Sequence, residues 1–292
     1  MPKFELLEPA DTREALSLLS ELGERARLLA GGTDLMVNLR RGRIRPEYVV
    51  RILSKEGLQG FSTGSTGLRI GAMATIREVA VHPAIKERFP ALARAALSMA
   101  TPQVRNRATI GGNLCNASPA ADTAPPLLVH DAEVDISGAA GSRTMPLRDF
   151  FQGPGAAALQ AGEILTAIRV PDPGTGVGAA FIKLGVRKAQ EIAIVSVAVL
   201  LRRGAAGQVD EARIALGAVA PTPLRVPAAE DELRSRPFSL ELAARAAGLA
   251  ASAVEPIDDV RATAEYRRAM AGVLVERALV DAWEKAAENC EG

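Results

Sequence analysis

Two glycine-rich segments are the part of this sequence best suited to chemistry. They are residues 30–34 (AGGTD) and residues 109–113 (TIGGN). Glycine lacks a Cβ, so the backbone can approach a bulky anion closely and can adopt a positive φ at little cost. Successive amide groups in such a turn form a concavity that binds anions. Two of these turns in one chain predict a dinucleotide whose diphosphate is held from both sides.

Polar side chains around the two turns extend this prediction. Neutral donors that could complete a phosphate site without a charged clamp are Thr33, Thr109, Asn113 and Asn116. Asp122 could accept hydrogen bonds from ribose hydroxyls. The alternative for Asp122 is a carboxylate in the first turn of a helix that Ser118 caps and Pro119 begins. Asp34 would repel a phosphate that it faced, so we expect its carboxylate to bind amides of its own loop.

Few side chains here suit acid–base or nucleophilic chemistry. The two histidines are His82 and His130, and the two cysteines are Cys115 and Cys290. Two cysteines are too few for an iron–sulfur cluster or a structural zinc site within this chain. We expect Cys115 and both histidines to be structural, and we predict no catalytic residue and no metal site. A protein whose reactivity belongs to a bound cofactor fits this composition.

Length and charge limit the class of protein. A chain of 292 residues predicts about two domains. Its 35 basic and 34 acidic residues give a net charge of +1, which argues against a nucleic-acid-binding surface. The exception is the run of arginines in residues 40–45, either a solvated loop or a contact surface for an acidic partner. No apolar stretch is long enough for a membrane helix or a signal peptide, so we expect a cytoplasmic protein.

The pattern of apolar residues predicts the elements that hold the two turns. Strands are expected over residues 3–7, 27–30, 48–53, 68–72, 133–136 and 164–170, and helices over 12–22, 35–39 and 90–100. Asp11 with Glu14 and Thr75 with Glu78 are capping boxes at helix starts. The first glycine turn therefore follows a strand directly.

Residues 171–176 (PDPGTG) break both helix and strand and mark a domain boundary. Residues 174–179 spell the G-x-G-x-x-A dinucleotide fingerprint, but a strand is expected after them, which disfavours a Rossmann site. Beyond the boundary, the pattern predicts strands over residues 180–184, 193–201 and 212–219 and helices over 240–254 and 264–288.

Segments spread over nearly the whole chain resemble one family. They are residues 29–35, 102–113, 117–119, 162–165, 191–193 and 266–274, together with Asp122, Lys183, Arg187 and Lys188. In this order they resemble the FAD-binding medium subunit of the molybdenum hydroxylases, the family of xanthine dehydrogenase and carbon monoxide dehydrogenase. Ile192 and Met99 differ, because certain relatives carry an aromatic residue at these positions.

The resemblance implies an α+β fold in two domains. Residues 1–175 would form a p-cresol methylhydroxylase-type FAD-binding domain with two α/β subdomains, at about 1–56 and 57–175. Residues 176–292 would form a C-terminal α+β domain of sheet plus helices, similar to that of the carbon monoxide dehydrogenase flavoprotein.

The resemblance also implies which residues bind FAD. They are Leu29, Ala30, Gly31, Gly32, Thr33, Asp34, Leu35, Thr109, Gly111, Gly112, Asn113, Asn116, Ser118, Asp122, Ile164, Leu165 and Lys183. Asp122 would lie near the sugar, Ile164 and Leu165 near the adenine, and Lys183 near the isoalloxazine, where a cation could stabilise charge on the reduced ring. The alternative for Lys183 is an exposed lysine at a strand edge.

The function implied is electron transfer within a larger enzyme. FAD, bound without a covalent link, would take electrons from the [2Fe-2S] clusters of a small subunit and pass them to an external acceptor. A large subunit would hold molybdopterin and oxidise the substrate, in a dimer of heterotrimers. Two alternatives are a stand-alone flavin oxidoreductase with its own substrate and a scaffold that has lost its cofactor.

Overall fold

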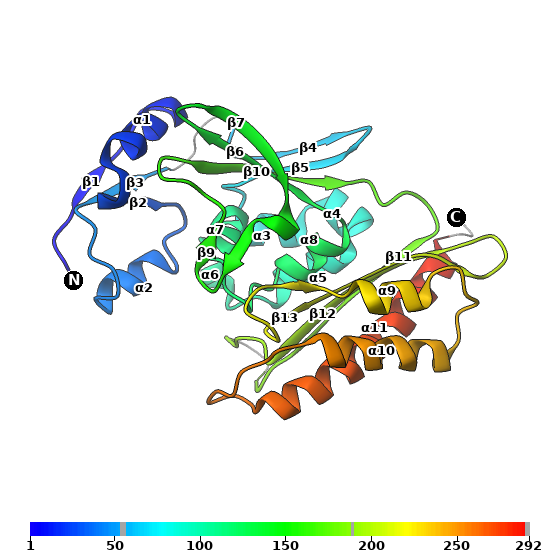
Figure 1. Ribbon diagram of the computed structural model, residues 1–292. Helices are drawn as coiled ribbons and strands as arrows, with labels where there is room; N and C mark the ends of the chain where they lie inside the picture. Colours follow the sequence, from blue (N-terminus) through cyan, green and yellow to red (C-terminus); the bar gives the residue numbers. More distant parts are fainter. Residues whose placement is uncertain (53–56, 188–189, 290–292) are drawn as a thin grey trace.

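The computed structural model describes residues 1–52, 57–187 and 190–289, and Figure 1 shows how its layers are arranged. Leu53, predicted to end a strand, and Cys290 lie outside these ranges. The N-terminal sheet lies at one end of the molecule. A second sheet covers a group of short helices, and a third sheet with three helices forms the opposite side.

The N-terminal sheet positions the first glycine segment. Its three parallel strands lie in the order β1-β3-β2, with β1 at Glu5–Leu7, β2 at Ala26–Leu29 and β3 at Tyr48–Arg51. Helix α1 (Thr12–Leu22) connects β1 to β2, followed by the 3-10 turn η1 (Gly23–Arg25). Asp11 caps α1 by accepting from the Glu14 amide at 2.8 Å, and Glu14 binds the amide of Ala10. Helix α2 (Leu35–Arg40) follows the glycine segment.

The second sheet has five antiparallel strands in the order β4-β5-β10-β6-β7. Their bounds are Phe61–Gly64, Gly67–Gly71, Ile164–Pro171, Glu133–Gly138 and Gly141–Pro146. One face packs on helices α3 (Ile76–Val81), α4 (Pro83–Arg88), α5 (Pro90–Ser98), α6 (Pro102–Arg105), α7 (Ile110–Cys115) and α8 (Ala124–Val129). The 3-10 turn η2 (Leu147–Asp149) and a small hairpin of β8 (Phe151–Gly153) and β9 (Ala156–Ala157) complete this part.

The third sheet is antiparallel, in the order β11-β12-β13-β14, with bounds Val177–Leu184, Val195–Arg203, Val209–Gly217 and Leu224–Arg225. Helices α9 (Pro227–Leu233), α10 (Leu240–Ala253) and α11 (Ala264–Glu288) cover one face. Helices α5 and α8 of the preceding part contact the other face. Strand β12 is therefore buried on both sides, which explains its nearly unbroken apolar sequence.

This architecture is the predicted α+β fold, and most predicted elements are present within a residue or two of their bounds. Two predictions are wrong. Ser118 and Pro119 do not begin a helix, because α8 starts at Ala124 with Thr123 as its N-cap residue. Residues 110–115 form the short helix α7 rather than an open turn. Residues 174–176 lead into β11 and residues 177–179 belong to it, as expected of a sequence that is not a Rossmann fingerprint.

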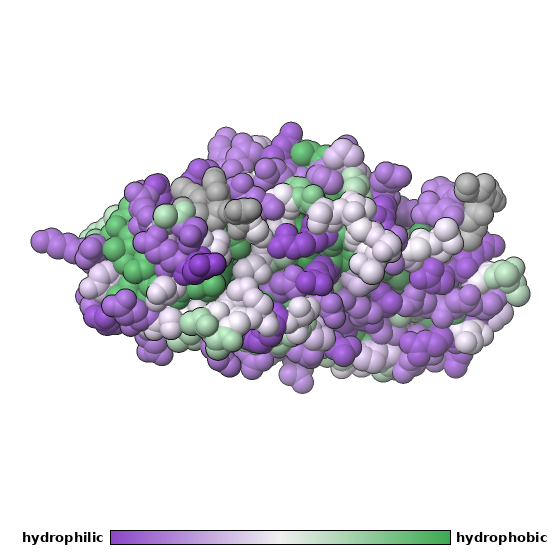
Figure 2. Space-filling model, turned by 90° about the horizontal axis from the view of Figure 1, so that it is seen from above, coloured by the Kyte–Doolittle hydropathy of each residue, from purple (hydrophilic) through white to green (hydrophobic). Residues whose placement is uncertain are grey.

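Two surface properties bear on partners. The face seen from above in Figure 2 is mostly hydrophilic, with its largest hydrophobic area at the end that carries the N-terminal sheet. Arg40, Arg41, Arg43 and Arg45 are all exposed, which both a solvated loop and a contact surface predict. Within the described ranges, no helix has the length and apolar character needed to cross a membrane.

Candidate cofactor site

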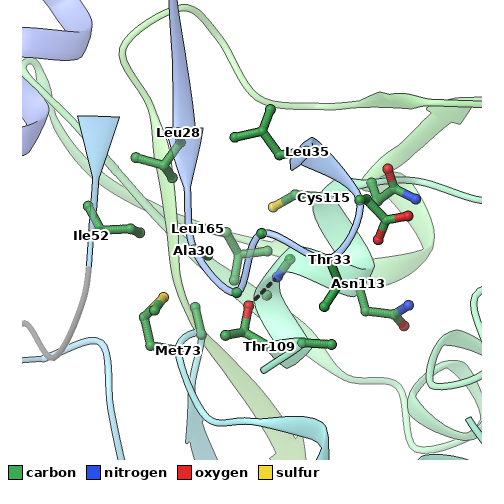
Figure 3. A pocket seen from close by; sticks show the side chains of 18 of the residues that line it. Leu28, Ala30, Thr33, Leu35, Ile52, Met73, Thr109, Asn113, Cys115 and Leu165 are labelled. Atoms are coloured by element: carbon green, nitrogen blue, oxygen red, sulfur yellow. Dashed lines mark hydrogen bonds between the residues drawn. The ribbon is translucent and has the colours of Figure 1, made fainter. Parts of the chain in front are cut away.

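A cavity of about 480 Å³ lies between the N-terminal sheet and helix α7, and both glycine segments line it. Figure 3 shows its two ends: Thr33 and Asn113 lie together at one, and Leu28, Ile52 and Met73 at the other. The predicted residues that line it are Ala30, Gly31, Gly32, Thr33, Asp34, Leu35, Thr109, Gly111, Gly112, Asn113, Asn116, Ile164 and Leu165. Its volume is in the range of small-molecule sites.

The first glycine segment presents unpaired backbone amides. It turns sharply between β2 and α2, with Gly32 at a φ of +77°. Among the residues that the structure describes, the amides of Gly32, Thr33 and Asp34 donate to no acceptor. Three consecutive amides in a turn of this kind suit the oxygens of a diphosphate. This segment fits the predicted role.

The second glycine segment differs from the prediction. Its amides are used inside the protein: Ile110 donates to the Ala74 carbonyl and Gly111 to the Ala72 carbonyl, both at 2.9 Å. The Gly112 amide donates to Thr109 Oγ1 at 3.0 Å, which caps α7 (Figure 3). The expectation of free amides on both sides of a diphosphate is therefore wrong for this side.

Helix α7 contributes side-chain hydrogen-bond donors to the cavity. Asn113 Oδ1 accepts from Thr123 Oγ1 at 2.7 Å, so this bond orients the amide and leaves its NH₂ group for a ligand. Asn116 also lines the cavity, at the C-terminal end of α7. The ordered amide of Asn113 gives a phosphate site on this side a neutral donor.

The glycines are required mainly by close packing. A Cβ on Gly31 would overlap the carbonyl group of Arg107, and a Cβ on Gly111 would lie 2.7 Å from the Cβ of Ala72. Real Cβ atoms do not make such contacts, so only glycine allows the two segments and strand β5 to come this close. The two glycine segments thus allow both sides of the cavity to pack closely, and this does not depend on which amides point into it.

The opposite end of the cavity is apolar. Leu28, Ile52, Met73, Ile164 and Leu165 line it, from strands and connections of the first two sheets. Ile164 and Leu165 were predicted from the resemblance, whereas Leu28, Ile52 and Met73 were not. The only sequence signal for these three is that they belong to or follow buried strands, which does not distinguish a cavity wall from a core. A flat purine fits such a surface.

We had expected the carboxylate of Asp34 to bind amides of its own loop, but it does not. Its side chain makes no capping hydrogen bond to α2. The residue is exposed at the surface, and partial burial on the cavity side raises the pKa of its carboxyl group.

Asp122 and Lys183 form a buried ion pair beyond this cavity. Lys183 Nζ lies 2.7 Å from Asp122 Oδ2, and their side chains are 5% and 7% exposed. Lys183 Nζ also donates to the carbonyls of Glu191 at 3.2 Å and Ser98 at 3.4 Å. Ser98 precedes Met99, which lines the cavity, so the pair lies close to the cavity. The pair joins the segment before α8 to β11 of the third sheet.

Both structural alternatives for this pair are wrong. Asp122 lies in the turn before α8 and caps no helix, and Lys183 is buried rather than exposed at a strand edge. Burial raises the pKa of Asp122, and although Lys183 opposes this, the pKa is about 6. Asp122 Oδ1 is buried without a hydrogen-bond partner. A donor from a bound molecule would satisfy it.

Besides Asp122 and Lys183, two predicted residues do not line the cavity. Leu29 is the last residue of β2 and pairs with Arg51 across the sheet. Ser118 Oγ accepts from the Ala120 amide at 3.3 Å. Both support neighbouring residues of the site rather than facing the cavity.

Cysteine and histidine have structural positions. Cys115 lines the cavity, and burial raises the pKa of its thiol to about 12. Burial, with the charge of Arg213, lowers the pKa of His130 to about 3. His82 stacks on Phe61 at 4.1 Å. No group of His, Cys, Asp and Glu side chains within the described ranges could hold a metal ion.

Comparison with known proteins gives matches over almost the entire chain. The family described as the FAD binding domain in molybdopterin dehydrogenase matches residues 2–173. The family described as the CO dehydrogenase flavoprotein C-terminal domain matches residues 180–282.

Individual relatives match at full length. The carbon monoxide dehydrogenase medium chain of Hydrogenophaga pseudoflava is 37% identical, covering 98% of this chain and 99% of that protein. A putative xanthine dehydrogenase FAD-binding subunit of Escherichia coli is 34% identical, covering 94% of both. A solved carbon monoxide dehydrogenase from Hydrogenophaga pseudoflava superimposes with a TM-score of 0.94 at 38% identity, covering 97% of this chain and 98% of that one. Quinoline 2-oxidoreductase from Pseudomonas putida superimposes with a TM-score of 0.91 at 29% identity, covering 99% of both chains.

Proposed function

Because this chain belongs to the family of FAD-binding medium subunits of the molybdenum hydroxylases, we propose that it transfers electrons through a non-covalently bound FAD. The electrons would come from the [2Fe-2S] clusters of a small partner subunit and leave to an external acceptor. A large molybdopterin-binding subunit would oxidise the substrate, in a dimer of heterotrimers.

The observation that carries this proposal is the turn after β2. Gly32, Thr33 and Asp34, whose amides are unpaired, line the same cavity as Asn113 with its oriented amide group. A diphosphate would use these donors, and the apolar end of the cavity would take the adenine. When bound, FAD supplies the exchange of two electrons, one at a time if the partner requires it.

Lys183 and Asp122 would act at the other end of the cofactor. Lys183 would place a positive charge near the isoalloxazine. Because Asp122 pairs with Lys183, its Oδ1 would accept a hydrogen bond from the ribityl chain of the flavin rather than from the ribose hydroxyls that the sequence suggested. Neither residue needs to donate or remove a proton. The stand-alone flavin oxidoreductase would need a proton donor over the flavin. Of the acidic groups that line the cavity, Glu163 is bound by Arg143 at 2.8 Å, the pKa of the Cys115 thiol is raised to about 12, and Asp34 lies in the segment that would hold the diphosphate.

The test is FAD binding by the purified chain. FAD at about 100 times its Kd should raise the free energy of unfolding by about 2.7 kcal/mol, and the protein should be yellow. Acid precipitation should release the flavin into the supernatant, because no covalent bond holds it. A colourless protein that FAD does not stabilise would refute the proposal.

A matched pair of glycine variants localises the site. Gly31→Ala should weaken FAD binding by at least about tenfold, since its Cβ must displace the Arg107 carbonyl and open the cavity. Gly248→Ala is the control, because a Cβ there has no neighbour within 4 Å and the position lies inside helix α10. It should leave FAD binding unchanged and stabilise the protein slightly.

The partner subunits are tested by isolating the chain from its native cells under mild conditions. Molybdenum and iron should co-purify with it in a fixed ratio to FAD. A chain that purifies alone, with FAD but without these metals, would instead support the stand-alone oxidoreductase.

A further inference from the structure

Arg267 is a buried arginine that the proposed function does not use. It lies in the first turn of α11, and its side chain is 4% exposed. Its Nη1 donates to the carbonyls of Ile194 at 2.7 Å and Ala218 at 3.1 Å, and its Nη2 lies 2.7 Å from Asp259 Oδ1. A buried guanidinium is costly unless it is paired and hydrogen-bonded. The three groups that pair with it therefore show what it organises.

The first carbonyl belongs to the hairpin between β11 and β12. The Ile194 amide donates to the Leu184 carbonyl at 2.8 Å and closes the hairpin next to Lys183. Glu191, three residues before Ile194, provides one of the carbonyls that bind Lys183 Nζ. Arg267 thus fixes the chain that carries one partner of Lys183.

The second carbonyl reaches the other partner. Ala218 follows β13 and has a φ of +66°, a conformation that alanine adopts only when its surroundings hold it. Its amide donates to the Pro119 carbonyl at 2.7 Å, across the boundary between the two parts of the protein. Pro119 is three residues before Asp122. Arg267 therefore also holds the segment that carries Asp122.

We propose that Arg267 is a positioning residue for the Asp122–Lys183 pair. It joins the hairpin that holds Lys183 to the segment that holds Asp122, although it touches neither side chain. This inference rests on the proposed function in one respect: the pair it positions would adjust the cofactor's affinity for electrons.

The charge that holds Arg267 does not change near neutral pH. Burial raises the pKa of Asp259, but hydrogen bonds from the Arg261 amide, Arg267 and the Arg261 side chain outweigh it and lower the pKa to about 2. Asp259 is therefore ionised over the working range of pH. Arg267 is a fixed link rather than a pH switch.

The test compares Arg267→Gln with Arg268→Gln, a neighbouring and exposed arginine on the same helix. The first measurement is amide hydrogen exchange of residues 117–122 and 190–196 in the FAD-free protein. Arg267→Gln should speed exchange in both segments by about tenfold or more, and Arg268→Gln should not. A role limited to helix α11 would speed exchange in that helix alone.

The second measurement is the ratio of affinities for reduced and oxidised FAD. A displaced Lys183 would stabilise charge on the reduced cofactor less, so the ratio should fall about tenfold in Arg267→Gln, or about 30 mV in potential. Arg267→Lys, which can reach one carbonyl but not both, should give a ratio between those of wild type and Arg267→Gln. Unchanged exchange and an unchanged ratio in a folded Arg267→Gln would overturn the proposal.

Two further results have a defined meaning: an Arg267→Gln variant that does not fold, and a wild-type protein that binds no FAD. If Arg267→Gln does not fold, hydrogen exchange is measured in Asp259→Asn and Arg267→Lys instead, because each weakens the bonds of Arg267 without removing all of them. Exchange at the wild-type rate in both variants would refute the inference. If the wild-type protein binds no FAD, the proposed function fails, while the exchange measurement still decides whether Arg267 positions the two segments.

Discussion

At the scale of single residues, the Asp122–Lys183 pair is unevenly satisfied. The three N–H groups of Lys183 match three acceptors: Asp122, the Glu191 carbonyl and the Ser98 carbonyl. Asp122 has one oxygen bound and one buried without a partner. The lysine is therefore in a favourable site for a cation, whereas the carboxylate loses more hydration than its bonds return. This imbalance explains why its pKa is raised despite a partner of opposite charge.

The raised pKa predicts a pH-dependent stability of the FAD-free protein. Asp122 binds its proton more tightly in the folded state, so its contribution to stability is present below the usual pKa of 3.8 and is lost as pH rises through about 6. Between pH 4 and 7, the free energy of unfolding of wild type should therefore fall by up to about 3 kcal/mol relative to that of Asp122→Asn, since one pKa unit is about 1.4 kcal/mol. Urea unfolding of both proteins at each pH measures the difference.

The control for this experiment is Asp149→Asn, which replaces a carboxylate that is 57% exposed. Its free energy of unfolding should follow that of wild type across the same pH range. A constant difference between wild type and Asp122→Asn would show that the folded and unfolded states bind this proton equally.

At the scale of elements, long periodic segments were predictable and short ones were not. The 25 residues of α11 follow one apolar stripe and begin at a capping threonine, so their bounds were predicted correctly. Helix α7 was missed because its sequence, IGGNLC, contains two glycines that favour a turn. It is helical because Ala72 and Ala74 bind its first amides and Thr109 caps it. Ala72 and Ala74 are far away in the sequence, so local propensity does not contain their contribution.

The cap of α7 gives the prediction at this scale. Thr109→Ala removes the acceptor of the Gly112 amide and should lower the free energy of unfolding by about 1 kcal/mol. It should also weaken FAD binding by roughly tenfold, because Asn113 follows directly in the same turn. Thr109→Ser keeps the hydroxyl and should restore both values. Thermal unfolding and FAD titration measure them.

A second cap separates stability from binding. Thr101 caps the short helix α6 by accepting from the Val104 amide at 3.3 Å, and it does not line the cavity. Thr101→Ala should cost a similar free energy of unfolding without weakening FAD binding. If both variants weakened FAD binding equally, the effect would come from general loosening of these helices rather than from the position of α7.

At the scale of the whole molecule, the third sheet joins two cores. Side chains of β11–β13 alternate between the two cores. Ala179, Phe181, Ala198, Leu200 and Ala215 face the helices of the FAD-binding part (residues 2–173), and Ala180, Val197, Val199, Ile214 and Leu216 face α9–α11. The alternation was visible in the sequence only as long apolar strands. Which helices would cover each face depends on contacts between distant segments, and so does the pairing of Asp122 with Lys183. The sequence therefore indicated about half of the cavity's lining and both members of this pair, but not that the two residues would bind each other.

A sheet shared by two cores predicts that the protein unfolds as one unit. Arg225 and Arg213 strengthen the connection, because they donate to the carbonyls of Leu128 and Val129 at the end of α8. The single tryptophan, Trp283, lies in α11 and reports only on the C-terminal part. Its fluorescence and the far-ultraviolet circular dichroism should therefore change at the same urea concentration.

The same connection predicts that FAD stabilises a region that it does not touch. FAD should shift the Trp283 transition by as much as the circular dichroism transition, because binding to the folded state stabilises the whole cooperative unit. Phe181→Ala, at the contact between β11 and the FAD-binding part, should lower both transitions by about 3–5 kcal/mol in free energy. Leu240→Ala, at a position that is 66% exposed, is the control and should change neither. A Trp283 transition that ignores FAD while circular dichroism responds would mean that the two cores fold independently and that β11 merely touches the FAD-binding part.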